Sequence, residues 1–277
     1  MRRALLIALG LCLVTAWPVL AFHDGGVAHC NGCHTMHNSQ DGALVDPDSP
    51  NGNPYLLTDG SPSDVCLGCH GAVFGNSVLD PDTERGAGNF IFLLEDNLND
   101  GHAGSLDPIP GDAAGHNLNA PGAGLAPDAT LTSAPGGNYP ASIMSCTSCH
   151  DPHGNEEFRL LYGVGPIQGG AYNFTQPAPV AVGLSIRSAA ESRTNHTAYQ
   201  SGMSAWCGNC HGNFHNNNTQ LIHPSGQTLG GGIAQIYNLY AGTGDQTGGT
   251  QPNAYLPQVA FEDPSTGTSG TGGPSGS

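Results

Sequence analysis

Lysine is absent from this 277-residue chain, and its six basic residues are all arginines. Segment 1–21 contains two of them, which leaves four arginines against 22 acidic residues and a net charge near −18 in the remainder. So acidic a chain argues against nucleic acid and anionic lipid as partners. The charge is typical of a solvated acidic surface, and it would also attract metal cations or positively charged mineral surfaces.

Apolar side chains are scarce as well. Aromatic residues make up only 6% of the chain, whereas Gly occurs 42 times and Pro 21 times. Such a composition cannot fill an ordinary hydrophobic core for a chain of this length, yet there is no extended charged block of the kind that indicates disorder. We therefore expect mainly irregular coil with short α-helices and little β structure.

Long apolar runs are missing except for one at the N-terminus. Ala4 to Leu20 follows Arg2 and Arg3, and Val19-Leu20-Ala21 is a small-residue cleavage signature before Phe22. Residues 1–21 are therefore predicted to be a secretory signal peptide, so that the protein would be secreted through the periplasm. No later run is long enough for a membrane span, so none is expected in the mature chain. Cys12 lies in the signal segment, and its removal leaves eight cysteines.

Those eight cysteines form four Cys-x-x-Cys-His motifs. In this motif the two thiols can add to haem vinyl groups while the adjoining imidazole reaches the iron. A zinc ribbon or a disulfide scaffold also uses paired cysteines, but neither needs a histidine after every pair. The sequence predicts four haem c groups, whose faces would replace the missing apolar interior. The attachment residues are Cys30, Cys33, Cys66, Cys69, Cys146, Cys149, Cys207 and Cys210, and the proximal iron ligands are His34, His70, His150 and His211.

Few segments carry a secondary-structure pattern. Short helices are expected over 30–37, 64–70 and 204–214, around three of the motifs. Apolar residues at i, i+3, i+4 and i+7 predict one amphipathic helix over 233–240. Residues 90–94 are compatible with a short strand or a buried loop, and residues 264–277 form a Ser/Gly/Thr-rich tail that is expected to be flexible. Residues 22–263 are expected to form one haem-templated unit.

One arrangement of histidines occurs twice. A single histidine, a Cys-x-x-Cys-His-x-x-His motif and a plain Cys-x-x-Cys-His motif follow one another from His23 through His70, and again from His116 through His211. This divides the unit into pseudo-repeats of about 22–110 and 111–263. Each copy supplies two haems, two proximal histidines and two further histidines. The chain therefore offers eight ligands for four six-coordinate irons.

Two histidines three residues apart cannot bind opposite faces of one haem, because their nitrogens must face each other about 4 Å apart across the macrocycle. His37 and His153 must therefore serve haems other than that of their own motif. We expect His23 to cap the second haem, His116 the fourth, and His153 to reach back to the first. By the same rule, His37 would reach the third haem of a neighbouring molecule, which predicts a head-to-tail polymer.

Other ligand choices stay open. His215 and His223 are alternative distal ligands that would keep all coordination inside one chain. Methionine is a poor candidate, and all-histidine ligation implies lower potentials than His/Met ligation. The other histidines are expected to be surface or loop residues: His29, His102 and His196.

Three segments carry a family resemblance: residues 22–39 (FHDGGVAHCNGCHTMHNS), residues 131–154 and residues 202–211. They resemble the extracellular multihaem cytochromes that polymerise into conductive filaments in metal-reducing bacteria, the outer-membrane cytochrome S and cytochrome E types. The resemblance implies bis-histidine haems stacked along the filament, with the residue matching His37 ligating a haem of the adjoining subunit. The four motifs match the haem count of the cytochrome E type rather than the six haems of cytochrome S. A histidine that cytochrome S carries near its second haem is missing here.

Electron transfer rather than catalysis is therefore expected. The leading prediction is an extracellular filament that exchanges electrons with outer-membrane or periplasmic cytochromes and with metal oxides or electrodes. The alternative is a monomeric periplasmic tetrahaem shuttle whose ligands are all internal. A multihaem reductase needs an iron with an open position, often marked by a lysine ligand, and this chain has no lysine.

Overall fold

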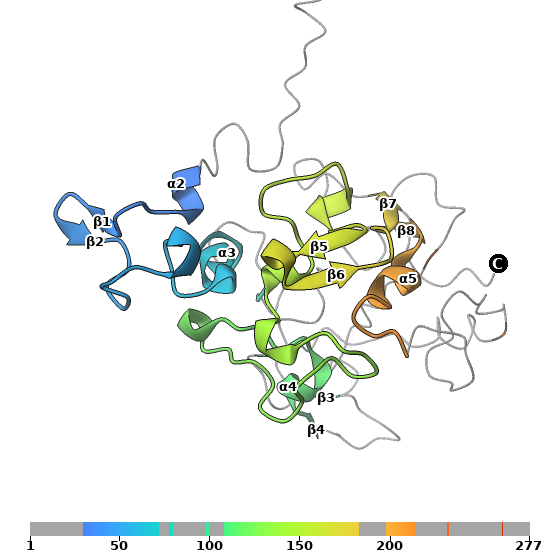
Figure 1. Ribbon diagram of the computed structural model, residues 1–277. Helices are drawn as coiled ribbons and strands as arrows, with labels where there is room; N and C mark the ends of the chain where they lie inside the picture. Colours follow the sequence, from blue (N-terminus) through green and yellow to red (C-terminus); the bar gives the residue numbers. More distant parts are fainter. Residues whose placement is uncertain are drawn as a thin grey trace, which may run out of the picture.

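The computed structural model describes residues 30–71, 78–79, 93, 98–99, 108–182, 198–213, 232 and 262. Within them, short helices and strand pairs are joined by long loops (Figure 1). The α-helices are α2 (Cys30–Cys33), α3 (Pro62–His70), α4 (Gly111–Ala114) and α5 (Met203–Cys207). The 3-10 helices are η1 (Pro54–Leu56), η3 (Pro121–Ala123), η4 (Ala141–Ile143), η5 (Cys146–Ser148), η6 (Phe158–Leu160) and η7 (Gln168–Gly170).

The described strands form four separate antiparallel pairs and no larger sheet. In the first pair, Asp41 and Gly42 form the turn with φ of 51° and 84°, the left-handed values that two-residue hairpin loops need. The strands are β1 (Ser39–Gln40) with β2 (Ala43–Leu44), β3 (Leu98–Asn99) with β4 (Pro108–Ile109), β5 (Gly165–Ile167) with β6 (Tyr172–Phe174), and β7 (Val180–Val182) with β8 (Ala198–Ser201). The prediction of irregular coil with short helices and little β structure is confirmed.

Helix α3 is the longest described helix, and it carries the second Cys-x-x-Cys-His motif. It starts two residues before the predicted boundary because Ser61 caps it: the Ser61 hydroxyl accepts a hydrogen bond from the Asp64 amide at 3.0 Å. Pro62 at the first helical position is preset for the helix, and the Asp64 carboxylate lies in the first turn, where the helix dipole favours it. Leu67 is buried and points into the core.

Two helix predictions were too long. Helix α2 ends at Cys33 instead of residue 37, because His34 forms an isolated bridge with Leu57 and the Thr35 amide donates to the Leu56 carbonyl at 2.7 Å. Helix α5 ends at Cys207, after which the chain turns. The predictions for 1–21, 233–240 and 264–277 lie outside the described residues, and of 90–94 only the buried Leu93 is described.

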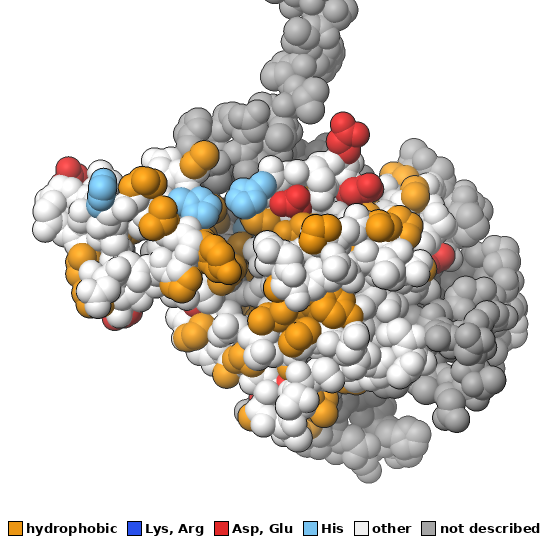
Figure 2. All heavy atoms as spheres, viewed as in Figure 1, with side chains coloured by type: hydrophobic (Ala, Val, Ile, Leu, Met, Phe, Trp, Pro, Cys, Tyr) orange, Lys and Arg blue, Asp and Glu red, His pale blue; other side chains and the backbone are white. Residues whose placement is uncertain are grey.

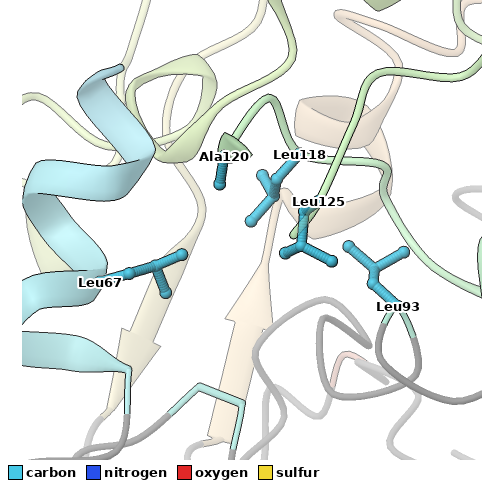
Figure 3. Packing of buried hydrophobic residues seen from close by; sticks show 5 residues of the cluster. All are labelled: Leu67, Leu93, Leu118, Ala120 and Leu125. Atoms are coloured by element: carbon cyan, nitrogen blue, oxygen red, sulfur yellow. The ribbon is translucent and has the colours of Figure 1, made fainter. Parts of the chain in front are cut away.

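The apolar core consists of two small clusters. Figure 3 shows the first, where Leu67 of α3 and Leu93 lie around the side chains of the 118–125 loop; its buried members are Leu67, Leu93, Leu118, Ala120 and Leu125. The second contains Tyr139, Ile167 and Phe174 beside Trp206. Both clusters include an attachment cysteine at their edge, Cys146 in the first and Cys210 in the second. No helix among the described residues is long and apolar enough to cross a membrane.

Candidate haem-binding sites

The attachment cysteines of successive motifs lie next to one another. Burial, and then the nearby Cys69 thiol, raise the pKa of Cys33 in the first motif. The Cys66 thiol donates a hydrogen bond to the Cys146 sulfur, which raises the pKa of Cys66 and lowers that of Cys146. The first motif therefore adjoins the second, and the second adjoins the third.

The third motif adjoins the fourth in the same way. Burial, and then the Cys210 thiol, raise the pKa of Cys149. Burial also raises the pKa of Cys207 to about 11 and that of Cys210 to about 12, so both thiols are neutral at pH 7. The four attachment points thus follow one another through the molecule in sequence order.

The cysteines do not gather as a zinc site would require. All eight described cysteines are free thiols, and the described residues contain no group of three or more His, Cys, Asp and Glu side chains that could hold a metal ion. A structural zinc site needs four such ligands around one point. The paired thiols instead lie beside a single histidine each, which is the donor set of covalent haem attachment.

Three of the four proximal histidines have one ring nitrogen fixed by the backbone. Nδ1 of His34 lies 2.9 Å from the Tyr55 carbonyl oxygen, and Nδ1 of His150 lies 2.8 Å from that of Arg159. Nδ1 of His211 lies 2.7 Å from the carbonyl oxygen of Pro135. A carbonyl can only accept, so Nδ1 carries the proton, and Nε2 keeps the lone pair that an iron ligand needs. Burial lowers the pKa of His150, which favours this neutral form.

Two further histidines face proximal ones from a different motif or loop. The ring centroids of His34 and His153 lie 6.2 Å apart with the planes 11° from parallel, and those of His116 and His211 lie 6.1 Å apart at 51°. Two imidazoles bound to opposite faces of one iron have nitrogens about 4 Å apart and therefore centroids about 6 Å apart. Both separations fit an iron between the rings, and both pairs are ones that the histidine repeat predicts.

His37 lies at the surface, beside a hollow whose walls include Met36 and Leu56. Met36 is 74% exposed and Leu56 47% exposed. Among the described residues, no second imidazole faces His37. Figure 2 shows histidine side chains on one face of the molecule, with apolar side chains and carboxylates around them and no described arginine on the face in view.

The first motif is held by a short segment that returns to it. The Thr35 amide donates to the Leu56 carbonyl at 2.7 Å, and the Thr58 amide donates to the Cys33 carbonyl at 2.9 Å. The Thr58 hydroxyl also donates to the Cys33 carbonyl at 3.3 Å, so with the bond from His34 to Tyr55 four hydrogen bonds hold residues 33–35 against residues 55–58.

The third motif has the same arrangement. The Asp151 amide donates to the Leu160 carbonyl at 2.7 Å, the Tyr162 amide donates to the Cys149 carbonyl at 2.9 Å, and His150 bonds to Arg159. We call residues 55–58 and 159–162 the first and second clasp. Neither clasp is predicted from the sequence, although each contains a Leu-Leu pair, at 56–57 and 160–161, that could have indicated it.

The fourth motif lies against the loop Pro135-Gly136-Gly137. The Asn213 amide donates to the Gly136 carbonyl at 2.7 Å, beside the bond from His211 to Pro135. A Cβ atom on Gly137 would overlap the backbone carbonyl oxygen of Cys210, so only glycine allows this approach. The indole N–H of Trp206 donates to the Tyr162 carbonyl at 2.8 Å, which ties the fourth motif to the second clasp.

The described residues include the eight cysteines, the four proximal histidines, and His37, His116 and His153. The other histidines named in the sequence analysis lie outside the described residues: His23, His29, His102, His196, His215 and His223.

The curated protein and the two solved structures that this chain resembles are all of the same cytochrome. No protein-family model matches the sequence. The chain is 34% identical over 322 aligned residues to the C-type cytochrome OmcS of Geobacter sulfurreducens, covering 95% of this chain and 74% of that protein. It resembles the cryo-EM structure of OmcS nanowires from that organism with a TM-score of 0.63 at 33% identity, over 87% of this chain and 73% of the other. A second structure, of the outer membrane cytochrome S filament, gives a TM-score of 0.64 at 31% identity, over 92% and 79% of the two chains.

Proposed function

This chain belongs to the family of the c-type cytochrome OmcS, and from that premise we propose that it is an extracellular tetrahaem cytochrome that polymerises head-to-tail into an electron-conducting filament. Membership makes haem c its cofactor, and haem c supplies reversible one-electron chemistry at its iron. The observation that carries the proposal is the two pairs of facing imidazoles, His34 with His153 and His116 with His211, whose ring centroids are 6.2 and 6.1 Å apart. Each pair would complete bis-histidine coordination of one iron.

The chain's own residues would give each haem a fixed place. Two thiols per motif would anchor the porphyrin edge, and the adjoining histidine would hold the iron through Nε2 while a backbone carbonyl holds Nδ1. We assign His153 to the first haem, His23 to the second and His116 to the fourth. Four six-coordinate irons leave no open position for substrate, so this assignment makes the protein an electron carrier rather than an enzyme.

The polymer follows from the equivalence of the first and third motifs. Both are held by a clasp with the same hydrogen bonds, and both continue with a second histidine three residues on. In the third motif that histidine, His153, faces the proximal histidine of the preceding odd-numbered motif. If the first motif acts alike, His37 needs a third haem that precedes it, and only another molecule can supply one. The exposure of His37 supports this proposal.

Electrons would pass along the motifs in sequence order. The attachment thiols of the first and second, second and third, and third and fourth motifs are neighbours. Haems on these thiols would lie close enough for successive transfer, and the His37 contact would continue the series into the next subunit. We propose a periplasmic passage directed by residues 1–21, electron donation by outer-membrane or periplasmic cytochromes, and metal oxides or electrodes as acceptors.

Replacement of His37 by Ala tests the polymer. We expect secreted His37→Ala protein to show particles instead of fibres by electron microscopy, and one haem in four to become high-spin in its visible and EPR spectra. His196→Ala serves as the control and should form fibres with four low-spin haems. Fibres from His37→Ala with four six-coordinate haems would refute the assignment. That result would favour the alternative in which all iron ligands come from one chain and include His215 or His223.

A further inference from the structure

The two clasps share an unusual backbone. Tyr55 and Leu56 have φ of 57° and 58°, and Arg159 and Leu160 have φ of 50° and 58°. Two consecutive left-handed residues without a glycine are strained, and the same strain occurs twice in one chain at equivalent places. The carbonyl of the first residue of each pair accepts from a histidine Nδ1, and the carbonyl of the second accepts from the residue after that histidine.

Side-chain packing does not explain the strain. Tyr55 is 81% exposed and Arg159 is exposed, and the two side chains have nothing in common. The residues that anchor each clasp come afterwards: Leu57 is 9% exposed and Leu161 is 6% exposed. What the two clasps share is the direction of two successive carbonyl groups, both turned toward the histidine segment.

The fourth motif offers an internal comparison. There the carbonyl of Pro135 accepts from Nδ1 of His211, and the next residue, Gly136, has φ of 67° and accepts from the Asn213 amide. Here the residue that accepts from the histidine is a proline, whose ring fixes φ near −65°, and only the residue after it is left-handed, a glycine that adopts this conformation without strain. Among these three histidines, a left-handed residue without glycine as the acceptor of the histidine bond is therefore particular to the two clasps.

We propose that Tyr55 and Arg159 are positioning residues whose left-handed backbone fixes the hydrogen bond, and hence the orientation, of the proximal histidines of the first and third haems. This inference rests on the proposed haem ligation by His34 and His150. An Nδ1–H that donates to a carbonyl makes the imidazole a stronger donor toward iron and favours the ferric state. The clasps would therefore hold the potentials of these two haems below the value that freely rotating histidines would give.

Proline and glycine at position 55 separate the backbone from the side chain. Tyr55→Pro fixes φ near −65°, which turns the carbonyl away from His34, whereas Tyr55→Gly keeps the left-handed conformation and removes only the phenol. We expect the proline variant to show one haem with a more positive midpoint potential and an altered low-spin EPR signal. The glycine variant should match the parent protein in both measurements. Arg159→Pro and Arg159→Gly should repeat this pattern on a different haem.

Equal spectra and potentials for Tyr55→Pro and Tyr55→Gly would overturn the proposal, as would an equal shift in both. If Tyr55→Pro does not accumulate with four haems, Tyr55→Val provides the measurement, since a β-branched residue disfavours φ near 57° but keeps the amide; a shift in the same direction supports the proposal and its absence refutes it. These readouts do not depend on fibres. A protein that stays monomeric but shows the shift refutes the filament and leaves the clasp intact.

Discussion

Replacing Gly137 with Ala should release the fourth motif from the loop that orients it. The added Cβ would overlap the carbonyl oxygen of Cys210, a backbone atom that cannot rotate away. Overpacking of this kind costs about 1–3 kcal/mol. Moving the loop would also weaken the bonds from His211 to Pro135 and from Asn213 to Gly136, each worth about 1 kcal/mol. We expect the free energy of unfolding to fall by about 3 kcal/mol.

Thermal unfolding of the haem-loaded protein measures this, with an expected decrease in Tm of roughly 6–12 °C. Redox titration should also show one haem with a raised potential, because His211 loses its acceptor. Gly68→Ala is the matched control: it lies inside the second motif on α3, where an added Cβ meets nothing within 4 Å, and it should raise helix stability by about 1 kcal/mol. A Gly137→Ala protein as stable as Gly68→Ala, with unchanged potentials, would refute the packing argument.

Further predictions concern four other residues. His153→Ala should make the first haem high-spin and His116→Ala the fourth, as two different haems in EPR-monitored redox titration; loss of the same signal in both would contradict the pairings. Tyr139→Phe should lower the free energy of unfolding by about 1–3 kcal/mol, measured by thermal denaturation, because the Tyr139 hydroxyl bonds to Ser148 at 2.6 Å and Gln168 at 2.8 Å. The Asn53 side chain donates to Asp46 at 2.7 Å and holds the pKa of that carboxyl below its usual 3.8. This stabilisation is present above pH 3.8 and is lost as the pH falls through the lowered pKa. When the free energy of unfolding is measured against pH, Asp46→Asn should therefore lose less stability than the parent protein below pH 3.8.

Elements that depend on neighbouring residues could be predicted from the sequence, whereas contacts between residues far apart along the chain could not. The α3 helix was predicted because its pattern is local, and its true start at Pro62 follows from the adjoining Ser61 cap. The helix predicted at the first motif was four residues too long, because no residue near His34 in the sequence indicates that Leu57 forms a β-bridge with it.

The candidate sites divide in the same way. The attachment cysteines and proximal histidines are predicted by the spacing within the motif itself, and these assignments stay predictions. The carbonyl partners lie 21 residues after His34, 9 after His150 and 76 before His211, and no periodicity predicts such separations. The pairings of His153 and His116 came from the repeat, which is a counting argument, and they stay predictions with a geometry that fits them.

The unequal spacing of the two clasps bears on how the chain can change. Tyr55 follows its histidine by 21 residues and Arg159 follows its own by 9, yet both end in the same hydrogen bonds. The difference is a longer connection that contains the β1–β2 hairpin, and it leaves the hydrogen bond to the histidine in place. The Asp41-Gly42 tip of that hairpin is therefore a suitable attachment point for an inserted peptide or affinity label, since connections of different length precede the same hydrogen bonds at His34 and His150.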